Sequence, residues 1–153
     1  YVKFMEQYTG KHYPPGNFLD ASGAVVGTHR GAVAYTIGQR KGLGIALGEP
    51  AYVFQKDMAN NTVSVGKEAL LFSKGLIADD LNWIPFDRLE APLRLKAKTR
   101  YRQTEQWATA YPEGNGIRLE FDEPQRAITV GQAVVLYDGD LVLGGGTITG
   151  VIR

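Results

Sequence analysis

Short apolar stretches separated by turn residues recur through the second half of the sequence, and this spacing limits the possible folds more than any other feature. Within each stretch apolar and polar residues tend to alternate, which is the period of a strand with one buried face. The chain also carries 19 glycines and 7 prolines, which favour turns over long helices. A mainly β fold is therefore predicted, ending in a six-stranded antiparallel barrel or, alternatively, a sandwich. The predicted strands are residues 76–84, 93–103, 106–111, 117–121, 133–137 and 141–149, with one of the intervening turns at Glu123-Pro124.

The first half of the sequence contains two further pairs of short extended stretches. One pair flanks Ala21-Ser22-Gly23 and the other flanks Asn60-Asn61, and asparagine and glycine tolerate the positive φ angles of tight turns. Each pair is predicted to form a hairpin. The four strands concerned are residues 17–20, 24–28, 51–57 and 62–66.

These patterns divide the sequence into two predicted domains. Residues 1–8 have the apolar spacing of the tail of a helix, and residues 67–75 are a candidate linker. The prediction is a small β-rich central domain with the helix tail over residues 1–74, followed by the C-terminal β-barrel over residues 75–153. The sequence begins at Tyr1 rather than at a methionine, which is typical of a portion of a longer protein.

The composition excludes several classes of function. The formal net charge is +1, so the chain is not a globally basic nucleic-acid binder, and any RNA contact must come from a local patch. The absence of cysteine excludes disulfides, thiolate zinc sites and cysteine nucleophiles, and with only 2 histidines no metal site is expected. No apolar run approaches the roughly 20 residues of a membrane span, and no signal segment opens the chain, so a cytoplasmic location without membrane contact is expected.

Residues 28–45, THRGAVAYTIGQRKGLGI, fit no regular element and combine glycines with amide and cationic side chains. Gln39, Arg40 and Lys41 lie between glycines that allow positive φ angles or the close approach of a partner. The stretch is predicted to be a functional loop, because loops carry such groups more often than core elements do. The alternative is a turn-rich connection whose cations face water.

A second candidate site is a cationic strand within residues 92–104. Its cations alternate with mostly apolar residues, so a continuous strand would place all of them on one face, about 6.6 Å apart. Five like charges repel one another unless a polyanion or acids on a neighbouring strand, such as Glu120 or Asp122, neutralise them. We therefore weigh a polyanion-binding face against an ordinary solvated one, and expect Trp107 to be a core or interface aromatic rather than a base-stacking one. The five cations are Arg94, Lys96, Lys98, Arg100 and Arg102.

Four ordered motifs resemble the tRNA-specific 2-thiouridylases, enzymes that replace the 2-oxygen of the anticodon wobble uridine by sulfur. The resemblance covers essentially the whole chain, but only the part of the family that follows its catalytic domain. It implies a barrel like the second domain of translation elongation factors, preceded by a smaller β-rich central domain. The motifs are YTIGQRKGLGI (35–45), TRYRQT (99–104), FDEPQRA (121–127), and Gly131-Gln132 followed by YDG (137–139) and LGGG (143–146).

The resemblance implies roles for individual residues. Arg100, Tyr101 and Gln132 match family positions that contact tRNA, although Val130 replaces the usual proline before Gly131. The cationic strand adds Lys98 and Arg102 to these tRNA-binding candidates. Gln39, Arg40 and Lys41 are expected beside the catalytic cleft. Strand periodicity places Tyr101 in the barrel core, whereas the resemblance favours RNA contact.

The resemblance also implies what this chain lacks. In the family a separate domain uses ATP and magnesium to adenylate the uridine, and two cysteines carry sulfur that a relay protein delivers. Neither the ATP loop nor a cysteine occurs here, so no catalytic residue and no cofactor is assigned, and the chain alone is expected to be inactive. The alternative is a non-catalytic β module that binds an acidic protein partner. RNA affinity that titrates with salt would favour the first interpretation.

Overall fold

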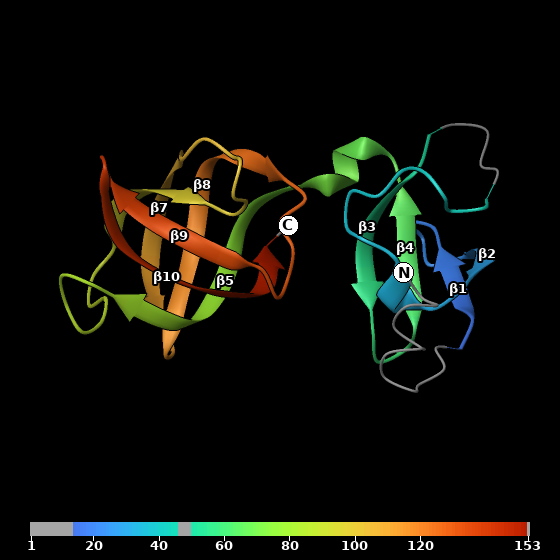
Figure 1. Ribbon diagram of the computed structural model, residues 1–153, viewed down its shortest axis with the longest axis horizontal. Coiled ribbons are helices and arrows are strands. Elements are labelled where there is room, and N and C mark those ends of the chain that lie inside the picture. Colours follow the sequence, from blue (N-terminus) through green and yellow to red (C-terminus); the bar gives the residue numbers. More distant parts are fainter. Residues whose placement is uncertain (1–13, 46–49, 153) are drawn as a thin grey trace. The chain divides into compact units, whose positions relative to one another are not determined.

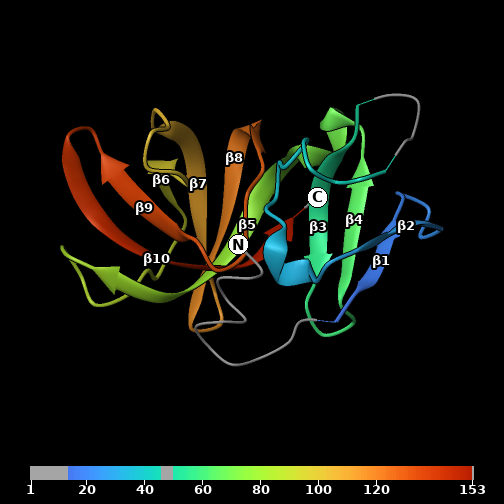
Figure 2. The ribbon, with the colours of Figure 1, turned by 45° about the vertical axis from the view of Figure 1, so that its right-hand side comes forward.

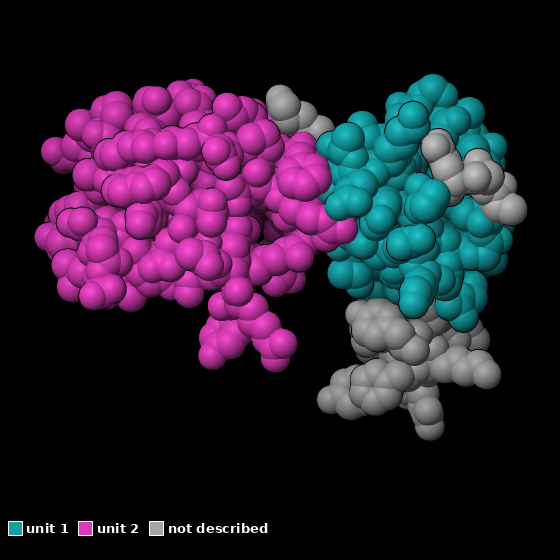
Figure 3. Space-filling model, turned by 90° about the horizontal axis from the view of Figure 1, so that it is seen from above, with its two compact units in different colours: residues 1–71 teal, residues 72–153 magenta. Residues whose placement is uncertain are grey.

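The computed structural model describes residues 14–45 and 50–152, and the chain divides into two compact units, residues 1–71 and residues 72–153 (Figure 3). The predicted helix over residues 1–8 lies outside the described residues. No described helix is long and apolar enough to cross a membrane.

Unit 1 is built on a four-stranded mixed sheet with the strand order β2-β1-β4-β3 (Figure 1). Both predicted hairpins are confirmed, since β1 pairs with β2 and β3 pairs with β4, each antiparallel. Between the hairpins, β1 and β4 run parallel, with Phe18 opposite Val63. The elements are β1 (Gly16–Leu19), β2 (Val25–His29), the 3-10 helix η1 (Ala32–Ala34), β3 (Tyr52–Asp57), β4 (Thr62–Gly66) and the 3-10 helix η2 (Glu68–Leu71).

The core of unit 1 is centred on three mutually packed rings. Phe18, His29 and Tyr35 form edge-to-face pairs whose centroids are 5.2–5.5 Å apart, and all three side chains are buried. Asn61, at the turn between β3 and β4, joins this cluster to its surroundings. Its carbonyl oxygen lies 2.8 Å from His29 Nε2, and its side-chain oxygen accepts a hydrogen bond from the Ala32 amide at 3.0 Å.

These contacts fix the protonation of His29. The Gly31 amide donates to Nδ1 at 2.9 Å, so Nδ1 carries no proton and Nε2–H donates to Asn61. Burial lowers the pKa of His29, and the hydrogen bond to Asn61 opposes this less strongly. A charged ring would also place a second N–H against the Gly31 amide. The native state therefore favours the neutral imidazole.

We expect unit 1 to lose stability on mild acidification. Above about pH 6.5, the pKa of His29 in the unfolded chain, the ring is neutral in both the folded and the unfolded state. Below that pH the unfolded chain takes up the proton first. The free energy of unfolding therefore falls by at most about 1.4 kcal/mol per pH unit. The fall ends below the folded pKa, where both states are protonated. NMR titration of the ring in a His12→Gln variant, which leaves one imidazole, tests this. A His29 ring that titrates at or above 6.5 would contradict it.

Unit 2 is a closed six-stranded barrel with the strand order β10-β5-β8-β7-β6-β9, and every neighbouring pair is antiparallel (Figures 1 and 2). The pairing of β9 with both β6 and β10 closes the barrel, so the predicted barrel is confirmed and the sandwich is wrong. The strands are β5 (Phe72–Trp83), β6 (Leu93–Lys98), β7 (Gln106–Glu113), β8 (Gly116–Arg126), β9 (Ala133–Asp138) and β10 (Leu141–Ile152).

Alternate residues of these strands fill the barrel with aliphatic side chains. Leu95 and Ala97 of β6, Leu119 of β8 and Leu136 of β9 are at most 1% exposed, while their sequence neighbours face outward. This core uses the period-two pattern that predicted the strands.

Several predicted limits were wrong. β5 begins at Phe72, so the last four residues of the predicted linker belong to this strand, and β7 and β10 continue to Glu113 and Ile152. β6 ends at Lys98 instead of continuing to Gln103, because the chain turns at Thr99. β8 continues through Glu123-Pro124 to Arg126, so no turn occurs there. The register between β5 and β8 is irregular over this stretch, and a strand proline is tolerated at such a place because fewer ladder hydrogen bonds are required of it.

Candidate nucleic-acid interface

The stretch predicted to be one cationic strand consists of the strand β6 and the turn that follows it. Arg94, Lys96 and Lys98 lie on the outward face of β6, alternating with buried residues. Arg100 and Arg102 lie in the turn that follows, where both side chains are exposed. The expectation of five cations on one strand face is therefore wrong. The strand ends at Lys98, but cations and other residues keep alternating in the sequence beyond it. Thr99, the first residue of the turn, is buried as a strand residue at that position would be, so the pattern resembles a longer strand.

A glutamine pair holds this turn in place. The backbone amide and the hydroxyl of Thr99 both donate to Gln103 Oε1, at 3.0 and 3.1 Å. Gln103 Nε2 in turn donates to Oε1 of the buried Gln125, near the end of β8, at 2.7 Å. Sequence reasoning missed both glutamines as supporting residues. Their separation of 22 positions left no local signal, although each belongs to one of the four motifs.

The same turn is tied to the loop that contains Gln132. Arg100 Nη2 donates to the carbonyl of Ala127 at 3.1 Å. Beyond Ala127 the loop returns to the barrel, where the Gly131 amide donates to Ile148 and the Ile148 amide donates to Gln132, at 2.8 and 2.9 Å. Gly131 has a φ of 92°, which suits glycine, and the Gln132 side chain is exposed. The Arg100 side chain thus ties the turn to the start of the loop that contains Gln132, at one end of the barrel.

Tyr101 is at the tip of the turn and 95% exposed. Of the two alternatives for Tyr101, the place in the barrel core is therefore wrong, and RNA contact stays a prediction. A tyrosine ring this exposed has no packing function in the described structure, and it is free to meet a ligand.

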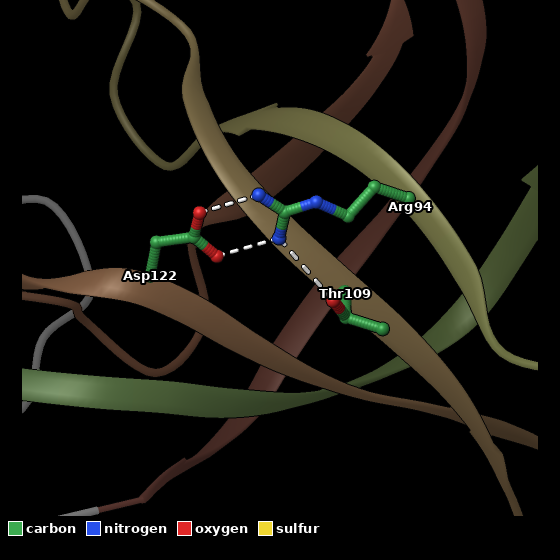
Figure 4. Close-up of polar contacts among 3 residues, drawn as sticks. All are labelled: Arg94, Thr109 and Asp122. Atoms are coloured by element: carbon green, nitrogen blue, oxygen red, sulfur yellow. Dashed lines mark hydrogen bonds and ion pairs between the residues drawn. The ribbon is translucent and has the colours of Figure 1, made fainter.

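On the flank of the barrel, Arg94 is neutralised by Asp122, one of the two acids that the sequence suggested for this role. Its guanidinium forms a bidentate ion pair with Asp122 of β8, passing over β7, where it also donates to Thr109 (Figure 4). The hydrogen bonds from Arg94 lower the pKa of Asp122 and keep it ionised. Glu120, the other acid considered, instead pairs with Arg118 at 3.3 Å.

The predicted functional loop, residues 28–45, contains the end of β2, η1 and a loop whose hydrogen bonds are made by Gln39. Gln39 Oε1 accepts from the Thr36 amide at 3.2 Å, and Nε2 donates to the Lys41 carbonyl at 2.7 Å. Its backbone also bonds to Val53 of β3. Arg40 and Lys41 are exposed, and within the described residues their side chains form no hydrogen bond or ion pair.

This contrast yields a prediction. Replacing Gln39 by alanine should lower the free energy of unfolding of unit 1 by about 1 kcal/mol, because two loop hydrogen bonds are removed. Replacing Arg40 by alanine should change stability by less than about 0.5 kcal/mol. If Arg40 lies beside a functional cleft, the same change in the full-length protein lowers activity far more than stability. Equal losses of stability for the two variants in chemical denaturation would contradict the conclusion that Gln39, and not Arg40, holds the loop together.

Comparison with known families covers both units. The tRNA methyl transferase PRC-barrel domain family matches residues 2–67, and the aminomethyltransferase beta-barrel domain family matches residues 73–148. Among curated relatives, the tRNA-specific 2-thiouridylase MnmA of Acetivibrio thermocellus is 55% identical over 149 residues, 97% of this chain and 42% of that protein. The protein of the same name from Symbiobacterium thermophilum is 48% identical over 154 residues, 100% of this chain and 40% of that protein. The chain thus spans about two fifths of the length of these relatives.

Proposed function

The chain belongs to the tRNA-specific 2-thiouridylase family, and on this premise we propose that it forms the tRNA-binding portion of an enzyme that thiolates the wobble uridine. The complete reaction is ATP-dependent and exchanges the 2-oxygen of the uridine for sulfur. ATP and magnesium belong to a catalytic domain outside this sequence, and a sulfur-relay protein is the proposed donor in the cytoplasm. This chain contains no cysteine, so on this proposal it does not thiolate tRNA alone.

The observation that carries the proposal is the pairing of two loops at one end of the barrel. Arg100 joins the turn of residues 99–103 to the loop of residues 127–132, and the exposed Tyr101, Arg102 and Gln132 belong to these two segments. Lys98 ends the adjacent strand. Cations for phosphate, an amide for hydrogen bonding and an aromatic face for a base are the groups that RNA recognition requires.

Salt titration of tRNA binding tests the proposal. Lys98→Ala and Arg102→Ala should each weaken binding and reduce the magnitude of the slope of log affinity against log salt by roughly 0.7 to 0.9 for each phosphate that the protein no longer neutralises. The matched control is Arg88→Ala, since Arg88 is an exposed cation paired with Glu90 in the loop that precedes β6. Affinity and slope that stay at the wild-type values in both test variants would overturn the proposal. Tight binding of an acidic protein without tRNA affinity would instead favour the β-module alternative.

A further inference from the structure

The flank of the barrel carries a concentration of cations packed on aromatic rings. Four such contacts occur among β6, β7, β8 and β9, which follow one another round the barrel in the order β8-β7-β6-β9 (Figure 2). Proteins show roughly one energetically significant contact of this kind per 70–80 residues, which is about the size of this unit. The flank therefore gathers cations and ring faces in one place, and this arrangement requires an explanation.

Two of these cations have no carboxylate partner among the described residues. Lys96 Nζ lies 4.8 Å from the centroid of Trp107, and Lys98 Nζ lies 5.6 Å from the centroid of Tyr137. By contrast, the arginines of this flank are engaged by its acids, Arg94 by Asp122 and Arg118 by Glu113 and Glu120. Within the described part of the chain, Lys96 and Lys98 form no ion pair, so their charges are available to an external anion.

The rings and the free lysines lie in register. Lys96 is the cross-strand partner of Trp107 on one side and of Tyr137 on the other, so the three residues form one row across β7, β6 and β9. The two outer strands of such a row are about 9.6 Å apart, twice the usual strand spacing. Lys98 lies on the same face about 6.6 Å further along β6, where the turn that carries Tyr101 begins.

Trp107 is half exposed, so it is not a core residue, and the expected alternative of an interface aromatic stays a prediction. The Lys96 ammonium and the Arg94 guanidinium lie over its ring, 4.8 and 5.1 Å from the ring centroid. Both cations are carried on flexible side chains, so a base can stack on the indole when one of them moves aside to a phosphate.

We propose that this flank binds unpaired nucleotides of the tRNA, with a base stacked on Trp107 and phosphates held by Lys96 and Lys98. This inference rests on the proposed function and extends the contact from the loops at the barrel end down the face of β6, β7 and β9. Each nucleotide supplies both a flat ring and a negative charge, which match the two kinds of group in the row. The acidic side chains of a peptide supply charge without a flat ring. Bases within a duplex are already stacked on each other, so the partner must be unpaired.

The test is fluorescence of the 153-residue chain with a nonamer of uridylate, in a Trp83→Phe background that leaves Trp107 as the single tryptophan. We expect the oligonucleotide to quench the emission. In a competition assay, Trp107→Ala should weaken its binding at least about fivefold, whereas Trp107→Phe should restore most of it because a ring face remains. Lys96→Ala should reduce the magnitude of the salt slope by about 0.7, and Arg88→Ala should leave binding unchanged.

Several outcomes would overturn the inference. Unquenched emission, or equal oligonucleotide affinity of Trp107→Ala and the wild type, would remove the stacking site. Polyglutamate that competes as well as the oligonucleotide, and is insensitive to Trp107→Ala, would make the flank a site for acidic proteins. If tRNA affinity falls in Tyr101→Ala but not in Trp107→Ala, the flank inference fails and the proposed function stands. If the chain binds no tRNA at all, the proposed function itself fails.

Discussion

Replacing Asn61 by alanine should lower the free energy of unfolding of unit 1 by roughly 2 to 4 kcal/mol. The side chain accepts the Ala32 amide and donates to the Pro14 carbonyl at 2.8 Å, so the change leaves two backbone groups without their partners. Asn61 also has a φ of 53°, a left-handed conformation that costs alanine about 1–2 kcal/mol. The same residue accepts from His29 through its carbonyl, so a shift of the turn would disturb the three-ring cluster.

Two further substitutions separate these contributions. Asn61→Gly removes both side-chain hydrogen bonds but adopts the positive φ without strain, so it should cost less than alanine. Asn61→Asp keeps the acceptor for Ala32 but sets a carboxylate oxygen against the Pro14 carbonyl oxygen, so it should recover only part of the loss seen with alanine. Hydrogen exchange of the strand amides of Val53 and Val65, whose pairing does not involve the Asn61 side chain, reports unit 1. Tryptophan fluorescence reports unit 2, because both tryptophans lie in the barrel. Equal stabilities for the alanine and glycine variants would show that the backbone strain is no larger than the entropic cost of glycine in the unfolded chain.

The sequence predicted those features of the fold that depend on neighbouring residues. Both hairpins of unit 1 follow from turn residues between two short extended stretches, and Asn61 does adopt the positive φ that its turn position suggested. The parallel pairing of β1 with β4 did not follow, because it joins segments more than 40 positions apart through burial of Phe18 and Val63. Barrel closure was likewise one of two open alternatives, since strand count and alternation are the same in a sandwich.

The candidate site was predicted less completely than the fold. Alternation in the sequence suggested one long cationic strand, but the period of two cannot distinguish a strand from a turn whose first residue, Thr99, is buried. The pair Gln103 and Gln125 was missed because a hydrogen bond between distant glutamines leaves no pattern in the sequence. For Trp107 the core and interface alternatives could not be separated from the sequence, because only the register of β7 shows which face the ring occupies.

The turn at the barrel end yields the sharpest test of RNA contact, because Tyr101 has so little to do with stability. With a side chain 95% exposed, Tyr101→Ala should change the free energy of unfolding by less than about 0.5 kcal/mol. If the ring stacks on a nucleotide, the same change should weaken tRNA binding by about 1–3 kcal/mol, or roughly 5-fold to 150-fold. Tyr101→Phe should bind nearly as well as the wild type, because the stacking face remains.

Arg100 must behave differently from its neighbour, and the difference serves as an internal control. Its guanidinium donates to the Ala127 carbonyl, so Arg100→Ala should loosen the tie between the two loops as well as remove a cation. Amide hydrogen exchange in residues 127–132 should therefore rise in Arg100→Ala and stay unchanged in Tyr101→Ala. Loss of tRNA affinity without faster exchange in the tyrosine variant would identify direct contact. If Tyr101→Ala binds tRNA as tightly as the wild type over a range of salt concentrations, the ring does not meet RNA, and the turn serves only to position Arg100 and the loop before Gln132.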